Sequence, residues 1–132
     1  MAQNYTFTGS LTMTANSATG YSQSQSGSFT MPITGVDQIA SGRIDCPTGS
    51  DATIMAAPGV GRIVYVKNMD DTSSLEIYEG ASTDNDLIGV LKPGEFLFTI
   101  IRGTGTTTAR GTSNAVTAEY FAVEIDSAAK AV

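Results

Sequence analysis

The sequence predicts an all-β protein, a two-sheet antiparallel sandwich resembling a jelly roll, with about eight short strands and an extended N-terminal segment. Three observations predict it. Short stretches of alternating or β-branched residues recur, turns bearing Gly and Pro separate them, and no long stretch has convincing helical periodicity. Because 132 residues suffice for one core, we expect a single sandwich domain over residues 1–132, with residues 16–28 as a polar loop or arm.

Two strands and the polar segment between them are expected in the N-terminal quarter. Residues 5–14 alternate, and residues 29–34 alternate again with Pro32 inside them, which indicates an edge strand because proline lacks a ladder donor. Residues 16–28 lose the alternation and are either a mobile loop or an arm that becomes ordered on a neighbour. The apolar residues of the first strand share the face that we expect to be buried: Tyr5, Phe7, Leu11 and Met13.

The middle of the chain predicts short strands around turn residues. Residues 35–42 have a weak pattern that allows one helical turn, and strands are expected at residues 43–46 and 52–56. Residues 62–68 are bulky and β-branched on both faces, which is typical of a strand covered on both sides or central in its sheet. Residues 75–78 alternate and predict another strand.

The most apolar stretch of the chain is expected to form the central hairpin of the core. Leu87–Leu91 and Phe96–Ile101 are apolar runs on either side of Pro93 and Gly94. Proline sets φ for the first corner of a type II turn, and glycine supplies the positive φ that the next corner needs. We interpret this unit as strand, turn, strand.

A short strand is expected at residues 106–109. The segment after it allows two interpretations. Residues 115–126 fit both a helical stripe of Ala and Ile and a strand covered on both faces. The Tyr-Phe pair with Val and Ile nearby, in a chain of short strands, favours the strand.

Few side chains suit catalysis. The chain has no histidine, which removes Ser-His-Asp and Cys-His activation and the commonest metal ligand. Carboxylate pairs occur at Asp70 with Asp71 and at Asp84 with Asp86, but these lie in polar turns where solvated acidic residues are usual. We expect no enzymatic activity and no cofactor.

A calcium site is the nearest match to a metal motif. Residues 84–95 have the spacing of an EF-hand loop, but Ile88 stands where an oxygen ligand is required and Pro93 interrupts the end. We therefore expect no metal site there. A looser site built from Asp70, Asp71, Asp84 and Asp86 is the alternative.

Charge and cysteine content limit the partners. The net charge is −6, and the 7 Lys and Arg residues are scattered, so neither nucleic acid nor an anionic membrane is an expected partner. The single cysteine, Cys46, excludes an intrachain disulfide and is expected to be a buried small hydrophobe. No signal peptide and no apolar stretch of membrane-spanning length is visible, so we expect a soluble compartment.

Four short motifs follow one another over about the C-terminal half: Val66-Lys67-Asn68, residues 70–74, Leu91-Lys92-Pro93-Gly94-Glu95 and Glu119-Tyr120. Their order resembles that in the small jelly-roll-like cement or decoration proteins of tailed bacteriophage capsids. The resemblance implies a virion protein on the outer capsid surface, made in the host cytoplasm, whose partner is the major capsid protein. It also implies a homo-oligomer, for which we expect a trimer.

By this interpretation a polar arm and one later loop contact the capsid. The expected contact residues are Tyr21, Ser22, Gln23, Ser24, Gln25, Arg102, Arg110 and Thr112. The first alternative is a tail, neck or fibre-knob subunit of a phage. The second is a soluble carbohydrate-binding module, against which the absence of Trp counts.

Overall fold

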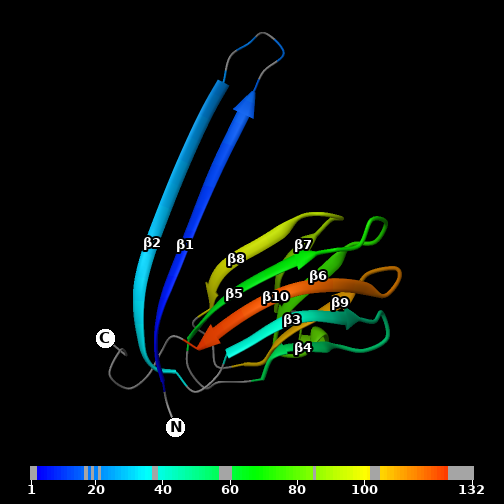
Figure 1. Cartoon of the computed structure of the whole chain (residues 1–132). Coiled ribbons are helices and arrows are strands. Elements are labelled where there is room, and N and C mark those ends of the chain that lie inside the picture. Colours follow the sequence, from blue (N-terminus) through cyan, green and yellow to red (C-terminus); the bar gives the residue numbers. More distant parts are fainter. Residues whose placement is uncertain are drawn as a thin grey trace.

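The computed structural model describes residues 3–16, 18, 20, 22–36, 39–56, 61–84, 86–101 and 105–124, and it confirms an all-β fold (Figure 1). The elements are β1 (Gln3–Asn16), β2 (Ser22–Val36), β3 (Ile39–Cys46), β4 (Ala52–Met55), β5 (Arg62–Asn68), β6 (Leu75–Glu79), the 3₁₀ turn η1 (Ser82–Asp84), β7 (Leu87–Leu91), β8 (Phe96–Ile101), β9 (Thr107–Gly111) and β10 (Val116–Glu124).

Eight of these strands form an antiparallel sandwich. One sheet has the order β3-β10-β5-β8 and the other β4-β9-β6-β7. Successive strands cross from sheet to sheet, except that β6 and β7 are neighbours in the same sheet. This winding is that of a jelly roll, so the predicted fold is confirmed.

The core lies between the two sheets. Val64 and Val66 of β5 and Leu75 and Ile77 of β6, one strand from each sheet, belong to the same core cluster, and all four are fully buried. The strand predicted at residues 62–68 is central, between β10 and β8, and β6 and β9 lie where short strands were expected. Residues 116–124 are a strand, not a helix, because they pair on one side with β3 and on the other with β5.

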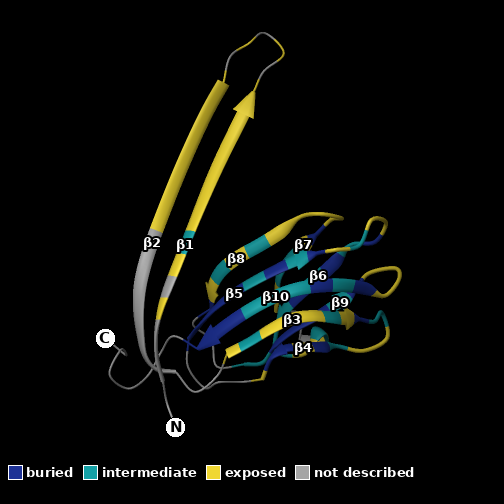
Figure 2. Ribbon diagram, in the orientation of Figure 1, coloured by how far each residue is buried: buried dark blue, intermediate teal, exposed yellow. Residues whose placement is uncertain are grey.

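Strands β1 and β2 form a separate two-stranded hairpin that extends away from the sandwich (Figure 1). Its register runs from Asn16 opposite Ser22 to Gln3 opposite Val36. Residues 22–28, left open as a loop or an arm, are therefore extended and paired, with exposed side chains (Figure 2). At about 3.3 Å per residue, β1 is roughly 45 Å long.

Two expectations for the N-terminal region are wrong. Leu11 and Met13 are 48% and 65% exposed, because the hairpin has two strands and no second sheet packs on this part of it. The side chains of Tyr5 and Phe7 lie outside the described part. Residues 39–42, for which a helical turn was allowed, belong to β3, because they pair with β10.

The expectation that residues 87–102 form a central hairpin is also wrong, although both expected strands and the turn between them are present. Gly94 has φ 81° and the Glu95 amide donates to the Lys92 carbonyl at 3.0 Å, as the type II turn requires. However, β7 pairs with β6 and β8 pairs with β5, at the edges of different sheets. The turn carries the chain between sheets instead of closing a hairpin within one.

No helix in the described part of the chain has the length and apolar character needed to cross a membrane.

Candidate functional site

The outer face of the β3-β10-β5-β8 sheet carries an apolar surface. Side chains alternate along a strand, so the neighbours of the core residues Val64 and Val66 point away from the core. The strand register places outward residues side by side in three rows across β8, β5 and β10. The rows are Ile100, Ile63 and Val123; Phe98, Tyr65 and Phe121; and Phe96, Lys67 and Glu119.

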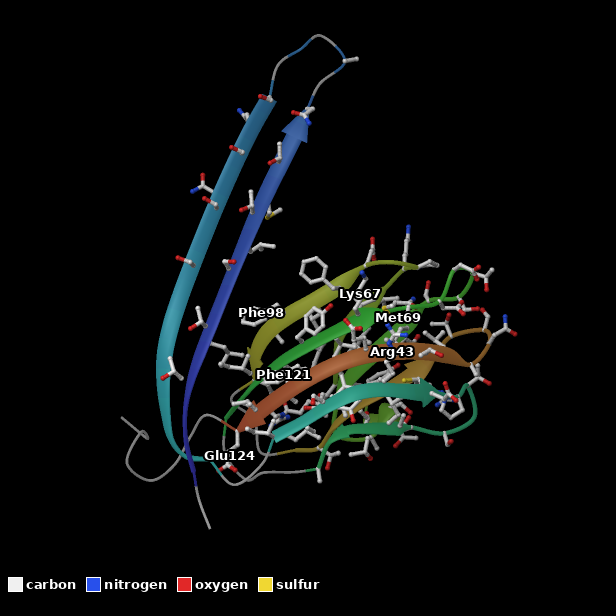
Figure 3. The ribbon with its side chains drawn as sticks, viewed as in Figure 1. Arg43, Lys67, Met69, Phe98, Phe121 and Glu124 are labelled. Carbon is white, nitrogen blue, oxygen red and sulfur yellow. The ribbon has the colours of Figure 1, made fainter. Side chains whose placement is uncertain are left out.

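Two of these rows are apolar, although the outer face of an antiparallel sandwich is usually polar. Ile63 and Val123 are buried, whereas Phe96, Phe98 and Ile100 are 49%, 41% and 43% exposed. Figure 3 shows Phe98 and Phe121 on the side of the sheet that faces the hairpin. The β8 side of the outer face therefore keeps a large apolar surface in contact with water.

The third row introduces charge at one end of this surface. Arg43 Nη2 lies 3.5 Å from Glu119 Oε2, and the Tyr65 hydroxyl donates to Glu119 Oε1 at 3.4 Å. Burial, and then the Glu119 charge, raises the pKa of Tyr65 above its ordinary value. The Tyr65 and Phe96 rings pack with centroids 6.1 Å apart, so the apolar and charged rows are joined through Tyr65.

A groove separates this sheet face from the hairpin. Its volume is about 580 Å³, within the roughly 300–1,000 Å³ typical of binding pockets. Of the residues whose side chains the structure describes, the hairpin and the sheet each contribute four to the lining: Gly9, Ser10, Leu11 and Gly27 from the hairpin, and Tyr65, Lys67, Phe96 and Phe98 from the sheet. The groove is therefore a mainly apolar space between two regions of the same chain.

The expected contact residues do not gather at this groove. Residues 22–25 lie exposed on the distal part of β2, whereas Tyr21 and Arg102 lie outside the described residues. Arg110, on β9 of the other sheet, donates through Nε to the Thr48 carbonyl at 2.6 Å and through Nη1 to Ser82 Oγ at 3.1 Å. Thr112 is exposed, and its hydroxyl donates to the Ser74 carbonyl at 3.2 Å.

Asn68 connects the first three motifs that carry the phage resemblance. Its Nδ2 donates to the carbonyls of Ser73 and Leu91 at 2.8 and 2.9 Å, and its Oδ1 accepts from the Asp70 amide at 2.8 Å. Its backbone also bonds to Glu95 and Gly94. The buried Asn68 therefore holds the acidic turn and the Pro-Gly turn together, which gives these motifs a structural role.

The acidic residues form no metal cluster in the described part of the chain, where the side chain of Asp84 is not included. Asp70 Oδ2 instead accepts hydrogen bonds from the amides of Ser73 and Thr72 at 2.6 and 3.0 Å. These bonds, that from Ser73 first, lower the pKa of Asp70 below its ordinary value. This carboxylate therefore stabilises a turn.

Cys46 is buried in the core as expected. Burial, and then the charge of Asp45, raises the pKa of its thiol to about 11. The reactive thiolate is therefore rare at neutral pH.

Sequence reasoning missed the outer face, although a signal for it was present. Phe96, Phe98 and Ile100 alternate with Leu97 and Ile101, so a strand with one face in the core must present the other residues outside. A separate signal marked the hairpin, since no charged residue occurs before Asp37.

Comparison of the chain with protein-family models, with curated proteins and with solved structures found no match.

Proposed function

We propose that the protein is a structural component of a tailed bacteriophage particle, a cement protein that binds the outer capsid surface and strengthens contacts between major capsid subunits. The observation that carries the proposal is the long exposed hairpin on a compact jelly-roll body. Such an arm can reach across a junction between neighbouring subunits while the sandwich stays on one of them.

The side chains of the distal hairpin suit a docking role. Residues 22–25 are Ser, Gln, Ser and Gln, all exposed, and they pair with residues 13–16 of β1. Their hydroxyl and amide groups can donate and accept hydrogen bonds without the cost of burying a charge. We infer that the distal part of the hairpin, residues 13–16 and 22–25, is the first contact with the major capsid protein.

The Arg110 region is the second expected contact, and its geometry changes the role of that residue. Because Arg110 is held by Thr48 and Ser82, it supports the surrounding loops more than it reaches outward. Thr112 is exposed beside it and can contact a partner. The jelly roll, the resemblance in motif order and the acidic net charge of −6, which would not adhere to the packaged genome, agree with this proposal.

The test is binding of the purified full chain to capsids made without it, measured by co-sedimentation with procapsids and with expanded particles. We expect saturable binding to expanded particles, and electron microscopy should place the added density between major capsid subunits. If the chain bound to neither procapsids nor expanded particles, the cement role would be contradicted. Density on the tail would favour the tail-subunit alternative.

A pair of variants locates the contact. Ser24→Arg adds bulk and charge at the distal hairpin, and Thr53→Arg makes the same kind of change at an exposed strand position on β4. We expect Ser24→Arg to weaken capsid binding by about tenfold or more, since a buried unpaired charge is costly, and Thr53→Arg to leave it unchanged. Equal effects of the two variants would show that the distal part of the hairpin is not the contact.

A further inference from the structure

The apolar outer face and the hairpin are each incomplete on their own. Phe96, Phe98 and Ile100 remain exposed in a row on β8, while Leu11 remains exposed on the hairpin across the groove. A two-stranded hairpin is also at best marginally stable in water unless something packs on it. Apolar groups that fill the groove would therefore remove apolar side chains of both surfaces from water and stabilise both.

Charge is divided unequally between the hairpin and the body. All 13 acidic and 7 basic residues follow Val36, so the net charge of −6 lies outside the hairpin. Two acidic bodies repel each other when they approach, whereas an uncharged arm does not add to this repulsion. The hairpin is therefore the part of one copy best suited to lie on the surface of another.

Gly27 adds an independent observation. It lies in the groove opposite Leu11 on the paired strand, and a Cβ at this position would meet nothing within 4 Å. No left-handed φ requires glycine there. A glycine inside a strand often marks the close approach of another backbone, and no such backbone is present around Gly27 in the described chain.

We propose that the groove between the hairpin and the β5–β8 face receives the β1–β2 hairpin of a second copy of the chain. The apolar side of the incoming arm covers Phe96 and Phe98, and its backbone passes close to Gly27. The proposal concerns the protein alone and does not depend on capsid binding, so either can fail without the other.

The chemistry of the groove favours a protein arm over a small ligand. Among the described residues of its lining, Lys67 is the one charged residue, and few polar groups converge there to orient a small molecule. The exposed apolar row also continues past the groove to Ile100, farther than a compact ligand would cover. An extended, uncharged hairpin has the shape and composition for this surface.

The first experiment measures the mass of the purified full chain by sedimentation over a range of concentrations. We expect reversible association above the monomer mass of 13.7 kDa. Phe96→Ser combined with Phe98→Ser should weaken association by about tenfold or more, as loss of buried aromatic contacts does. Val90→Ser, which changes an equally exposed residue on β7 of the other sheet, should not. A monomer at all concentrations would overturn the proposal.

Gly27→Val provides a variant that does not remove an apolar contact. Valine is favourable in strands and has open space here, so the hairpin should fold, but the added side chain blocks an approaching backbone. Gly89→Val is the control, because Gly89 is a β7 glycine that also has open space around its Cβ position. We expect Gly27→Val alone to reduce association; equal association of both variants would contradict the proposed path of the arm.

Mixing variants separates arm-on-face docking from face-on-face docking. One variant carries Met13→Asp in the arm, at an exposed residue outside the described groove lining, and the other carries Phe96→Ser and Phe98→Ser on the face. Each alone should be monomeric. Because the intact arm of the second can dock on the intact face of the first, the mixture should regain association, with both variants in the complex. A mixture that stays monomeric would overturn docking by the arm.

Discussion

In the sandwich, each sheet buries one face against the other, so residues such as Leu75, Ile77 and Val66 lose all contact with water. In the hairpin, the described side chains of residues 10–16 and 22–28 are exposed, and the two strands pair with each other as an antiparallel ladder. The same alternation of apolar and polar residues therefore contributes differently to folding stability in the two regions. Burial stabilises the sandwich, whereas the exposed hairpin is available for a partner.

The outer face of the β3-β10-β5-β8 sheet lies between these extremes. Ile63 is buried on it, yet Phe98 on the neighbouring strand is substantially exposed. Apolar surface that remains exposed on a folded protein often marks an interaction site. This face borders the groove that the hairpin lines on its other side.

The largest expected effect tests whether the sandwich alone carries the core. Ile77→Ala should lower the free energy of unfolding by about 2–5 kcal/mol, because a fully buried side chain leaves a cavity. Leu11→Ala in the hairpin should change it by less than about 0.5 kcal/mol, since Leu11 is half exposed. Urea unfolding of the dilute protein measures both. Similar losses would show that the hairpin belongs to the cooperative core.

Asn68 tests whether the sandwich depends on its inter-turn hydrogen bonds. Asn68→Ala removes three side-chain bonds, two of them to carbonyls of the buried residues Ser73 and Leu91, so we expect a loss of about 2–3 kcal/mol in unfolding free energy. Asn114→Ala is the control, because this exposed side chain has one bond, to Ser73 Oγ. If the two variants unfold alike, Asn68 does not hold the turns together.

A glycine in the sandwich should tolerate substitution by alanine less well than a glycine in an open loop. A Cβ at Gly111 would collide with the Asn114 carbonyl oxygen, whereas one at Gly49 would meet nothing within 4 Å. Gly111→Ala should therefore cost about 1–3 kcal/mol of unfolding free energy through forced backbone movement. Gly49→Ala should be near neutral. Thermal unfolding followed by circular dichroism gives the difference, and tolerance of Gly111→Ala would contradict the close packing at this turn.

The smallest expected effect is a dependence of stability on acidic pH. The pKa of Asp70 is lowered in the folded protein, so its contribution is present above the ordinary carboxyl pKa of about 3.9 and is lost as pH falls through the lowered value. Asp70→Asn should reduce stability at neutral pH and flatten its decline below about pH 4. Urea midpoints from pH 6 to pH 2.5 test this, and parallel curves would exclude Asp70 as a source of the decline.

Local sequence patterns were sufficient for most of the strands. The β-branched run at residues 62–68 and the alternation at residues 75–78 predicted β5 and β6, because side-chain period follows directly from backbone geometry. Pro93 and Gly94 predicted their turn for the same reason, since φ preferences are properties of single residues. The number and spacing of these elements favoured a two-sheet sandwich, whereas the strand order within each sheet came from the structure.

The sequence by itself determined which residues are extended, where the chain turns, and that the N-terminal 36 residues carry no charge. Only the tertiary structure decided that residues 87–101 divide between two sheets, that Leu11 stays exposed, and that Phe96 and Phe98 line a groove. The physical reason is that alternation assigns side chains to two faces but does not say which face has a partner. Burial depends on which strands pair and which sheets pack, and contacts between residues distant in sequence determine both.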